Sequence, residues 1–129
     1  MIVNTSNDFN WLVTRNSSSF LMKRRGVNHH FSKDPMNPKG LYKPRFQGSV
    51  QKRAVSVVED PSGKGVVLKY KSKHQQNKPA KSVTSVQLSR GSRRAFKAIK
   101  NVTNKQNYRK DLKNVSFALF YQNILNFFV

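Results

Sequence analysis

Residues 45–73 read RFQGSVQKRAVSVVEDPSGKGVVLKYKSK and hold two alternating runs on either side of a turn. Alternation with a period of two is typical of half-buried strands. The turn, EDPSGKG at residues 59–65, favours a hairpin, because Pro presets its own φ and Gly adopts positive φ readily. The expected apolar face carries Val55, Val57, Val66, Leu68 and Tyr70. The expected opposite face is a ladder of lysines: Lys69, Lys71 and Lys73.

A single hairpin is marginally stable in water, so another part of the chain must cover its apolar face. Residues 93–102 predict a helix with Phe96, Ile99 and Val102 along one side, and this helix is the expected cover. Residues 83–88 alternate as a third strand would, or form an extended arm. The predicted fold class is therefore α+β: a small antiparallel sheet built on a central hairpin, packed against C-terminal helices, with a long basic loop.

The N-terminal part predicts shorter elements. Residues 1–7 are expected to be frayed. A short helix is expected to start from Ser6 or Asp8, with Phe9, Leu12 and Val13 on one side. A short strand is expected within SFLMKRR at residues 19–25.

The segment from Val27 to Arg45 carries three prolines and no period of either kind, which indicates an extended loop. Basic and aromatic side chains alternate along it, so it is expected to settle on RNA through charge and stacking. These side chains are Lys33, Lys39, Lys43 and Arg45 with Phe31, Tyr42 and Phe46.

The chain ends in an apolar stretch. A last helix is expected to begin near Asp111, and residues 114–129 are apolar nearly all round. The stretch is shorter than the ~20 apolar residues that span a bilayer, and polar residues interrupt it. A buried or partner-binding helix is therefore expected.

Charge limits the possible partners. The 129 residues, enough for a single domain, include 25 Lys and Arg against 5 Asp and Glu, a formal charge of +20. Internal pairing cannot neutralise this excess, so an external polyanion must. Nucleic acid is the first candidate, because neutralising phosphates releases condensed counterions, and an anionic membrane surface is the second.

Catalytic and cofactor chemistry has few residues to use. Cysteine is absent, which excludes disulfides, thiolate zinc sites and cysteine nucleophiles, and no secretory signal is evident, so the chain is interpreted as intracellular. Only Glu59 and Asp60 adjoin among the acids, and neighbours in a turn point apart. His29 and His30 lack the usual spacing of metal ligands, and no phosphate-binding loop is present. We expect no enzyme, no metal and no cofactor.

Basic groups occur in pairs and triplets over the whole length. This spread, without one dominant patch or a recognition helix, suits a protein held on several sides by a folded RNA. The predicted RNA-binding residues are Arg15, Lys23, Arg24, Arg25, Lys43, Arg45, Lys52, Arg53, Lys69, Lys71, Lys73, Lys78, Lys81, Arg93, Arg94, Tyr108, Arg109 and Lys110.

Several motifs resemble a known family. FNWLVTRNSSSFLMKRR, which starts at Phe9, is similar to the start of the eukaryote-specific ribosomal protein twenty-eight family of the large subunit. Further similar motifs follow in the same order as far as Lys113: FSKDPMNPKGL, RFQGSVQKRAVSV, GKGVV, QNKPAKS and YRKDL. Two stretches depart from the family pattern, namely the MNPKGLYKP loop and the apolar end VSFALFYQNILNFFV, where the family has an Arg-rich helix and a basic tail.

The resemblance implies a compact α+β protein of the cytosolic large ribosomal subunit, which passes through the nucleolus during assembly, supports translation, and contacts large-subunit ribosomal RNA and neighbouring proteins without catalysis. The basic residues at positions that match the family's motifs are Arg15, Lys23, Lys52, Lys69, Lys78, Arg109 and Lys110. Two alternatives stay open. One is a ribosome-biogenesis factor with a related RNA-binding N-terminal domain, and the other is a basic membrane-surface protein anchored by its apolar tail.

Overall fold

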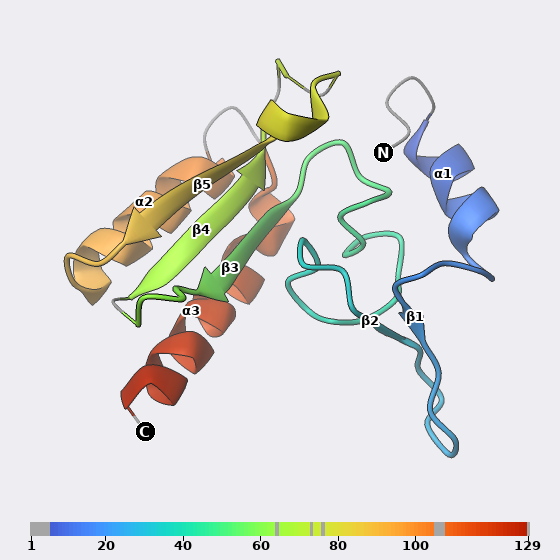
Figure 1. The fold of residues 1–129 in the computed structure, drawn as a ribbon, viewed down its shortest axis with the longest axis horizontal. Coiled ribbons are helices and arrows are strands. Elements are labelled where there is room, and N and C mark those ends of the chain that lie inside the picture. Colours follow the sequence, from blue (N-terminus) through green and yellow to red (C-terminus); the bar gives the residue numbers. More distant parts are fainter. Residues whose placement is uncertain (1–5, 64, 73, 76, 105–107, 129) are drawn as a thin grey trace.

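The structure is a computed structural model that describes residues 6–63, 65–72, 74–75, 77–104 and 108–128, with the backbone alone at 124–128 (Figure 1). Its helices and strands confirm the predicted α+β class. In chain order they are α1 (Asn7–Thr14), β1 (Leu21–Met22), β2 (Phe31–Ser32), β3 (Val55–Glu59), β4 (Val66–Lys71), the 3-10 helix η1 (Pro79–Lys81), β5 (Val83–Leu88), α2 (Ser92–Asn104), the 3-10 helix η3 (Lys110–Leu112) and α3 (Lys113–Phe128).

The predicted hairpin forms the first two strands of the larger sheet. The strand order is β3-β4-β5, both pairs are antiparallel, and Leu68 of β4 lies opposite Val57 of β3 and Val86 of β5. In the turn, the Gly63 N–H donates to the Asp60 carbonyl at 2.9 Å, and Gly63 has a φ of 77° that favours glycine. The hairpin and the third strand are therefore confirmed.

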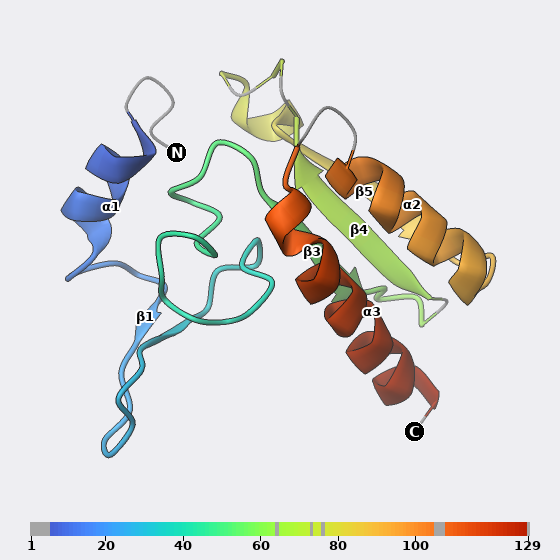
Figure 2. The ribbon, with the colours of Figure 1, turned by 180° about the vertical axis from the view of Figure 1, so that it is seen from behind.

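Two helices cover one face of this sheet. Figure 2 shows α2 and α3 lying side by side along the strands, in front of the sheet in that view. As predicted, Ile99 of α2 is part of the core, and Phe96 and Val102 pack against it. The Phe96 ring also contacts the Phe120 ring of α3, with 4.7 Å between the centroids. Each fully buried Val, Leu or Phe adds about 1.5–3 kcal/mol, so this core stabilises most of the fold. Its buried members are Val55, Val57, Val66, Leu68, Ala95, Ile99, Tyr108 and Phe120.

The last helix packs on the sheet rather than standing free. Phe120 of α3 is 2% exposed, and the side-chain amide of Asn123 donates to the Val57 carbonyl at 3.1 Å. The helix begins at Lys113, after the 3-10 turn that contains Asp111, close to the predicted start. Over the described part of the chain, no helix has the length and apolarity needed to cross a bilayer.

Residues 6–51, here called the N-terminal region, lie beside the sheet and its helices (Figure 1). In this region β1 and β2 pair antiparallel, with Met22 opposite Phe31, and Phe31 also bridges to Leu41. A long loop is therefore confirmed, since only the two residues of β2 interrupt it, but it is not extended as predicted. A series of turns folds the segment back on β2.

Buried polar side chains help to hold these turns together, beside a few buried apolar ones. Gln47 is 1% exposed, and its carbonyl oxygen accepts from the Ser32 hydroxyl at 2.8 Å and from the Asn37 amide at 3.2 Å. The buried Asp34 carboxylate accepts from the Ser49 N–H at 3.0 Å. Hydrogen bonds of this kind leave no trace in hydrophobic periodicity, so sequence patterns did not reveal the order of this segment.

Helix α1 starts at the first of the two predicted positions. The Ser6 hydroxyl caps it by accepting from the Phe9 N–H at 3.2 Å, so residues 6 and 7 are not frayed, and residues 1–5 lie outside the described residues. The predicted apolar side of Phe9, Leu12 and Val13 exists, but it points outward: these side chains are 52%, 60% and 58% exposed.

Candidate nucleic-acid interface

Most of the predicted RNA-binding residues lie on the surface. Lys69 and Arg109 are half-buried, Lys71 and Tyr108 are buried, and Lys73 lies outside the described residues. The exposed ones come from both regions of the molecule: Arg15, Lys23, Arg24, Arg25, Lys43, Arg45, Lys52, Arg53, Lys78, Lys81, Arg93, Arg94 and Lys110.

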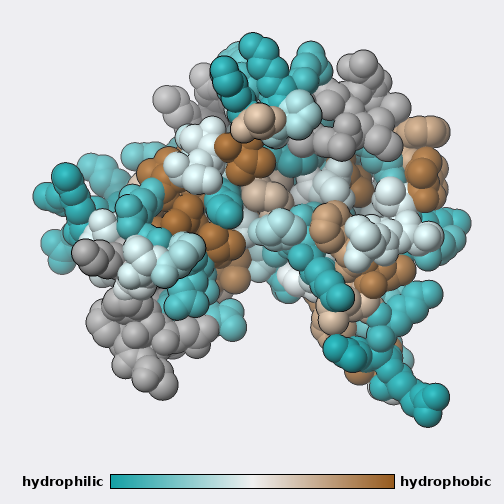
Figure 3. Space-filling model, in the orientation of Figure 1, coloured by the Kyte–Doolittle hydropathy of each residue, from teal (hydrophilic) through white to brown (hydrophobic). Residues whose placement is uncertain are grey.

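A projecting loop carries one dense group of cations. Residues 23–30 connect β1 to β2, and every one of them is exposed. Figure 1 shows this loop reaching away from the rest of the molecule, and hydrophilic atoms cover the corresponding projection in Figure 3. The part of the loop that leaves β1 is the triplet Lys23, Arg24 and Arg25, and the chain then turns at Gly26, which has a φ of 79°. A loop of this shape can bring three cations to phosphates that a flat surface would not reach.

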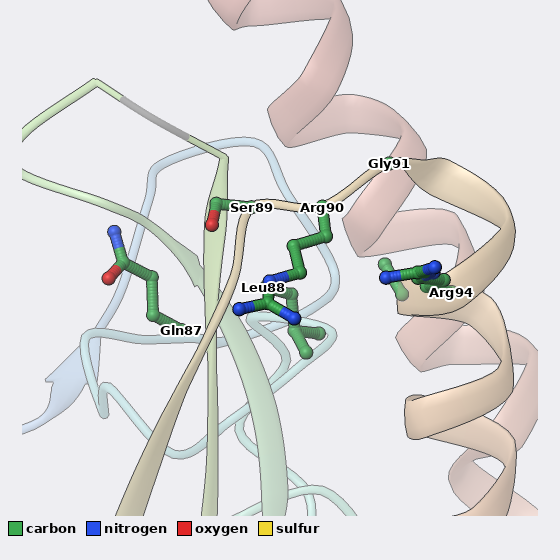
Figure 4. A pocket seen from close by; sticks show the side chains of 7 residues that line it. Gln87, Leu88, Ser89, Arg90, Gly91 and Arg94 are labelled. Atoms are coloured by element: carbon green, nitrogen blue, oxygen red, sulfur yellow. The ribbon is translucent and has the colours of Figure 1, made fainter.

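A second group surrounds the start of α2. A cavity of about 260 Å³ lies between the end of β5 and the first turn of α2, and Arg90, Gly91 and Arg94 contribute to its lining. Figure 4 shows the guanidinium groups of Arg90 and Arg94 in this space. The sequence prediction included Arg94 but missed Arg90, although the spacing of Arg90 from the Arg93 and Arg94 pair was a usable signal.

Lys71 is not part of an exposed ladder, and this prediction is wrong. The side chain is on the expected face of the sheet, but residues 48–51 cover that face, and Lys71 is only 4% exposed. Its Nζ donates to the carbonyls of Gly48 and Gln51, at 3.0 Å for Gln51. Burial lowers the pKa of Lys71, and the nearby Asp34 carboxylate opposes that shift. The ammonium group thus ties the N-terminal region to the sheet.

Arg109 also serves the fold. Its guanidinium donates to both carboxylate oxygens of Asp111 at 3.0 Å, to the Arg53 carbonyl at 2.9 Å and to the Arg45 carbonyl at 2.8 Å. These bonds occupy four of the five N–H donors of an arginine, so little capacity remains for a phosphate. The hydrogen bond from Arg109 lowers the pKa of Asp111, and Arg45 adds to the effect through a 3.1 Å ion pair.

Tyr108, one of the predicted RNA-binding residues, is buried and therefore not accessible to RNA in this fold. It is 5% exposed, and its hydroxyl group bonds to the carbonyls of Lys71 and Ala54. The Arg53 guanidinium lies over its ring, 5.9 Å from the centroid. Burial raises the pKa of Tyr108 to about 12.

The aromatic residues of the predicted RNA-contacting loop also have partners within the chain. Tyr42 is 6% exposed, its ring lies 5.3 Å from that of Trp11, and its hydroxyl donates to the Thr14 carbonyl. Phe31 is half-buried in β2. Half-buried Phe46 has the Lys39 ammonium 5.1 Å and the Arg45 guanidinium 5.6 Å from its ring centroid. The expectation of aromatic stacking on RNA therefore fails for Tyr42.

The carboxylates cannot compensate the exposed cations. Asp34 and Asp60 are buried and accept hydrogen bonds from nearby groups, and the hydrogen bond from the Ser62 N–H lowers the pKa of Asp60. The ion pairs found among the described residues both use Asp111. In that same part of the chain, no group of three or more His, Asp or Glu side chains is placed to hold a metal ion. The arrangement offers many unneutralised cations on several sides of a small fold.

Comparisons with known proteins agree with this picture. The family model of the Ribosomal L28e protein family matches residues 9–121. The match therefore extends into α3, beyond the motifs that end at Lys113. Large ribosomal subunit protein eL28 of Schizosaccharomyces pombe is 34% identical over 119 residues, which cover 90% of this chain and 88% of that protein. Large ribosomal subunit protein eL28 of Caenorhabditis elegans is 38% identical over 80 residues, which cover 62% of this chain and 60% of that protein. The chain belongs to the Ribosomal L28e protein family.

Proposed function

We propose that this chain is a structural constituent of the cytosolic large ribosomal subunit and binds its ribosomal RNA through exposed lysines and arginines. The observation that carries the proposal is the exposure of these cations on both regions of a chain with 25 basic and 5 acidic residues. Two similar proteins that bear the name large ribosomal subunit protein eL28 support it.

The phosphate ligands are the exposed cations and not the buried ones. Two groups of exposed cations are Lys23, Arg24 and Arg25 on the projecting loop, and Arg90 and Arg94 at the start of α2. Phosphate contacts position a protein on RNA without reading sequence, and each neutralised phosphate releases counterions. Because the groups lie on different parts of the surface, RNA segments on more than one side hold the protein.

In this role the protein has no catalytic chemistry of its own. Its partners are large-subunit ribosomal RNA and neighbouring ribosomal proteins, it supports translation, and it passes through the nucleolus while subunits assemble. Lys71 and Arg109 contribute indirectly, because they fix the N-terminal region against the sheet.

Sedimentation tests this proposal directly. Lysate from cells that express the tagged full-length chain is separated on a sucrose gradient, and the chain is followed by immunoblot. We expect the chain in free large subunits and in translating polysomes. When puromycin dissociates the polysomes, the chain should move to the fractions of the free large subunit. Presence only in nucleolar precursors would instead identify a biogenesis factor, and presence only at the top of the gradient would contradict the proposal.

A further inference from the structure

Helix α1 has its polar and apolar sides reversed relative to a normal surface helix. The side that packs inward carries Asn7, Asn10, Trp11 and Thr14, of which Asn10 is 3% exposed. Hydrogen bonds tie this side to the rest of the N-terminal region: the Asn7 side-chain amide donates to the Gln51 side chain at 3.1 Å, and the Thr14 carbonyl accepts from the Tyr42 hydroxyl. A surface helix ordinarily buries its apolar stripe and shows its polar side to water.

The outward side of α1 groups exposed apolar side chains on one short helix. Seven large apolar side chains are exposed in the described part of the chain, and Phe9, Leu12 and Val13 of this one short helix are three of them. Figure 3 shows hydrophobic atoms at the right edge of the molecule, where α1 lies in Figure 1. Grouped apolar side chains on an otherwise very hydrophilic protein mark an interaction site.

The charge of this part of the chain differs from that of the rest. Residues 1–14 contain no lysine and no arginine and one acid, Asp8, whereas the remaining sequence holds all 25 basic residues. Anionic phosphates are therefore attracted mainly to the chain from Arg15 onward, which carries all of the lysines and arginines. Leu12 and Val13 also have no π-face on which a base could stack.

We propose that the outer side of α1, formed by Phe9, Leu12 and Val13, is a docking surface for a protein whose contacting patch is apolar with a basic rim. The basic rim complements Asp8, which RNA would avoid. The inference rests on the proposed function, since the partner is a neighbouring protein in the assembled large subunit. It divides the molecule into a cation-rich part that contacts RNA and one helix that contacts protein.

Photo-crosslinking tests this division. The full-length chain is expressed with p-benzoylphenylalanine at Leu12, large subunits are purified and irradiated, and the products are treated with ribonuclease or protease. The matched control carries the same group at Val27, an apolar residue 43% exposed on the projecting loop. We expect the Leu12 product to survive ribonuclease as a heavier band that contains one other protein, and the Val27 product to contain RNA.

A Phe9→Gln and Leu12→Gln double variant adds a second measurement, because glutamine keeps helix propensity and both sites are exposed. We expect unchanged unfolding temperature and unchanged affinity for ribosomal RNA, but about tenfold weaker retention on salt-washed large subunits, which corresponds to about 1.4 kcal/mol. Crosslinks from Leu12 to RNA or lipid, or none in subunits that contain the chain, would overturn the inference. Absence of the chain from large subunits would instead be a failure of the proposed function.

Discussion

The two regions of the molecule are stabilised in different ways. From β3 to α3, an apolar face of the sheet packs under two helices, and residues such as Leu68, Ile99 and Phe120 are 2% exposed or less. In the N-terminal region, the buried side chains include Gln47, Asn37 and Asp34, which take part in hydrogen bonds, beside a few apolar ones. The hydrophobic effect dominates in the first region, whereas the second also depends on a buried polar network.

This difference decides how each region should respond to mutation. Loss of apolar volume leaves a cavity, whose cost depends on how far the surroundings relax. Loss of one member of a buried polar network leaves its partners without hydrogen bonds, and the cost is local. Single substitutions should therefore have different effects in the two regions.

Replacing Phe120 by Ala should lower the stability of the folded protein the most, because this 2% exposed ring belongs to the core between the helices and the sheet. We expect a loss of about 3–5 kcal/mol in the free energy of unfolding. Urea denaturation followed by circular dichroism measures it. Gln122→Ala, at an exposed position on the same helix, is the control and should change stability by no more than about 0.5 kcal/mol. Equal effects of the two variants would show that α3 is not packed on the sheet.

Replacing Gln47 by Leu should loosen the N-terminal region alone. Leucine has a similar volume but cannot accept the hydrogen bonds that the Ser32 hydroxyl and the Asn37 amide donate to Gln47. We expect the free energy of unfolding of this region to fall by about 1–3 kcal/mol. Hydrogen exchange should show lost protection at the Ser32 and Tyr42 amides and retained protection in β4. Gln122→Leu, the same substitution on the surface, serves as control. Uniform loss of protection in both regions would contradict their independence.

The buried Tyr108, whose hydroxyl bonds to the Ala54 and Lys71 carbonyls, predicts that stability depends on pH in the alkaline range. Its pKa is raised from 10.0 to about 12, so between these values the folded protein keeps a proton that the unfolded chain has lost. Stability is therefore fully present below pH 10 and falls as pH rises toward 12, by on the order of 2 kcal/mol.

Thermal melts between pH 9 and 12 measure this fall, and the difference between the natural chain and Tyr108→Phe isolates it. The lowered pKa of Lys71 has the opposite effect on stability, because the folded protein loses this buried charge at a lower pH than the unfolded chain does. This effect is the same in both proteins and cancels in their difference. Parallel pH profiles for the two proteins would argue against a buried Tyr108.

The smallest expected effect compares two lysines of β4. Lys69→Met should make the dependence of ribosomal RNA affinity on salt shallower by about 0.7–0.9 in the log–log slope, because one phosphate contact is lost. Lys71→Met should leave that slope unchanged, because the buried ammonium bonds to the Gly48 and Gln51 carbonyls. Fluorescence anisotropy over a salt series measures both. An equal reduction for Lys71→Met would mean that Lys71 reaches RNA after all.

Hydrophobic alternation and helical spacing were enough to predict the region from β3 to α3. Val55, Val57, Val66 and Leu68 lie in the core as expected, because a period of two fixes which side chains share a face. The same rule placed Lys71 on the opposite face correctly, but periodicity cannot tell whether another segment covers that face.

The N-terminal region was predicted less well for related reasons. The spacing of Phe9, Leu12 and Val13 identified an apolar side of α1, but not that polar contacts turn this side outward. The network around Gln47 joins residues 10 to 15 positions apart in the sequence, so no local sequence pattern predicts it. For the candidate interface, charge indicated the ligand class, while the buried roles of Tyr108 and Arg109 depend on tertiary contacts.

The salt dependence of binding to ribosomal RNA tests the central claim most directly. The full-length chain is titrated against a fluorescently labelled large-subunit RNA transcript between 50 and 200 mM potassium chloride, with yeast transfer RNA as a reference for non-specific binding. If six to ten phosphates are neutralised, affinity should fall by about 10³–10⁵ over this range. Replacing Lys23, Arg24 and Arg25 together by Gln should make the log–log slope shallower by about 2–3. An affinity that does not change with salt, or a slope that this triple variant leaves unchanged, would contradict the claim that the exposed cations are phosphate ligands.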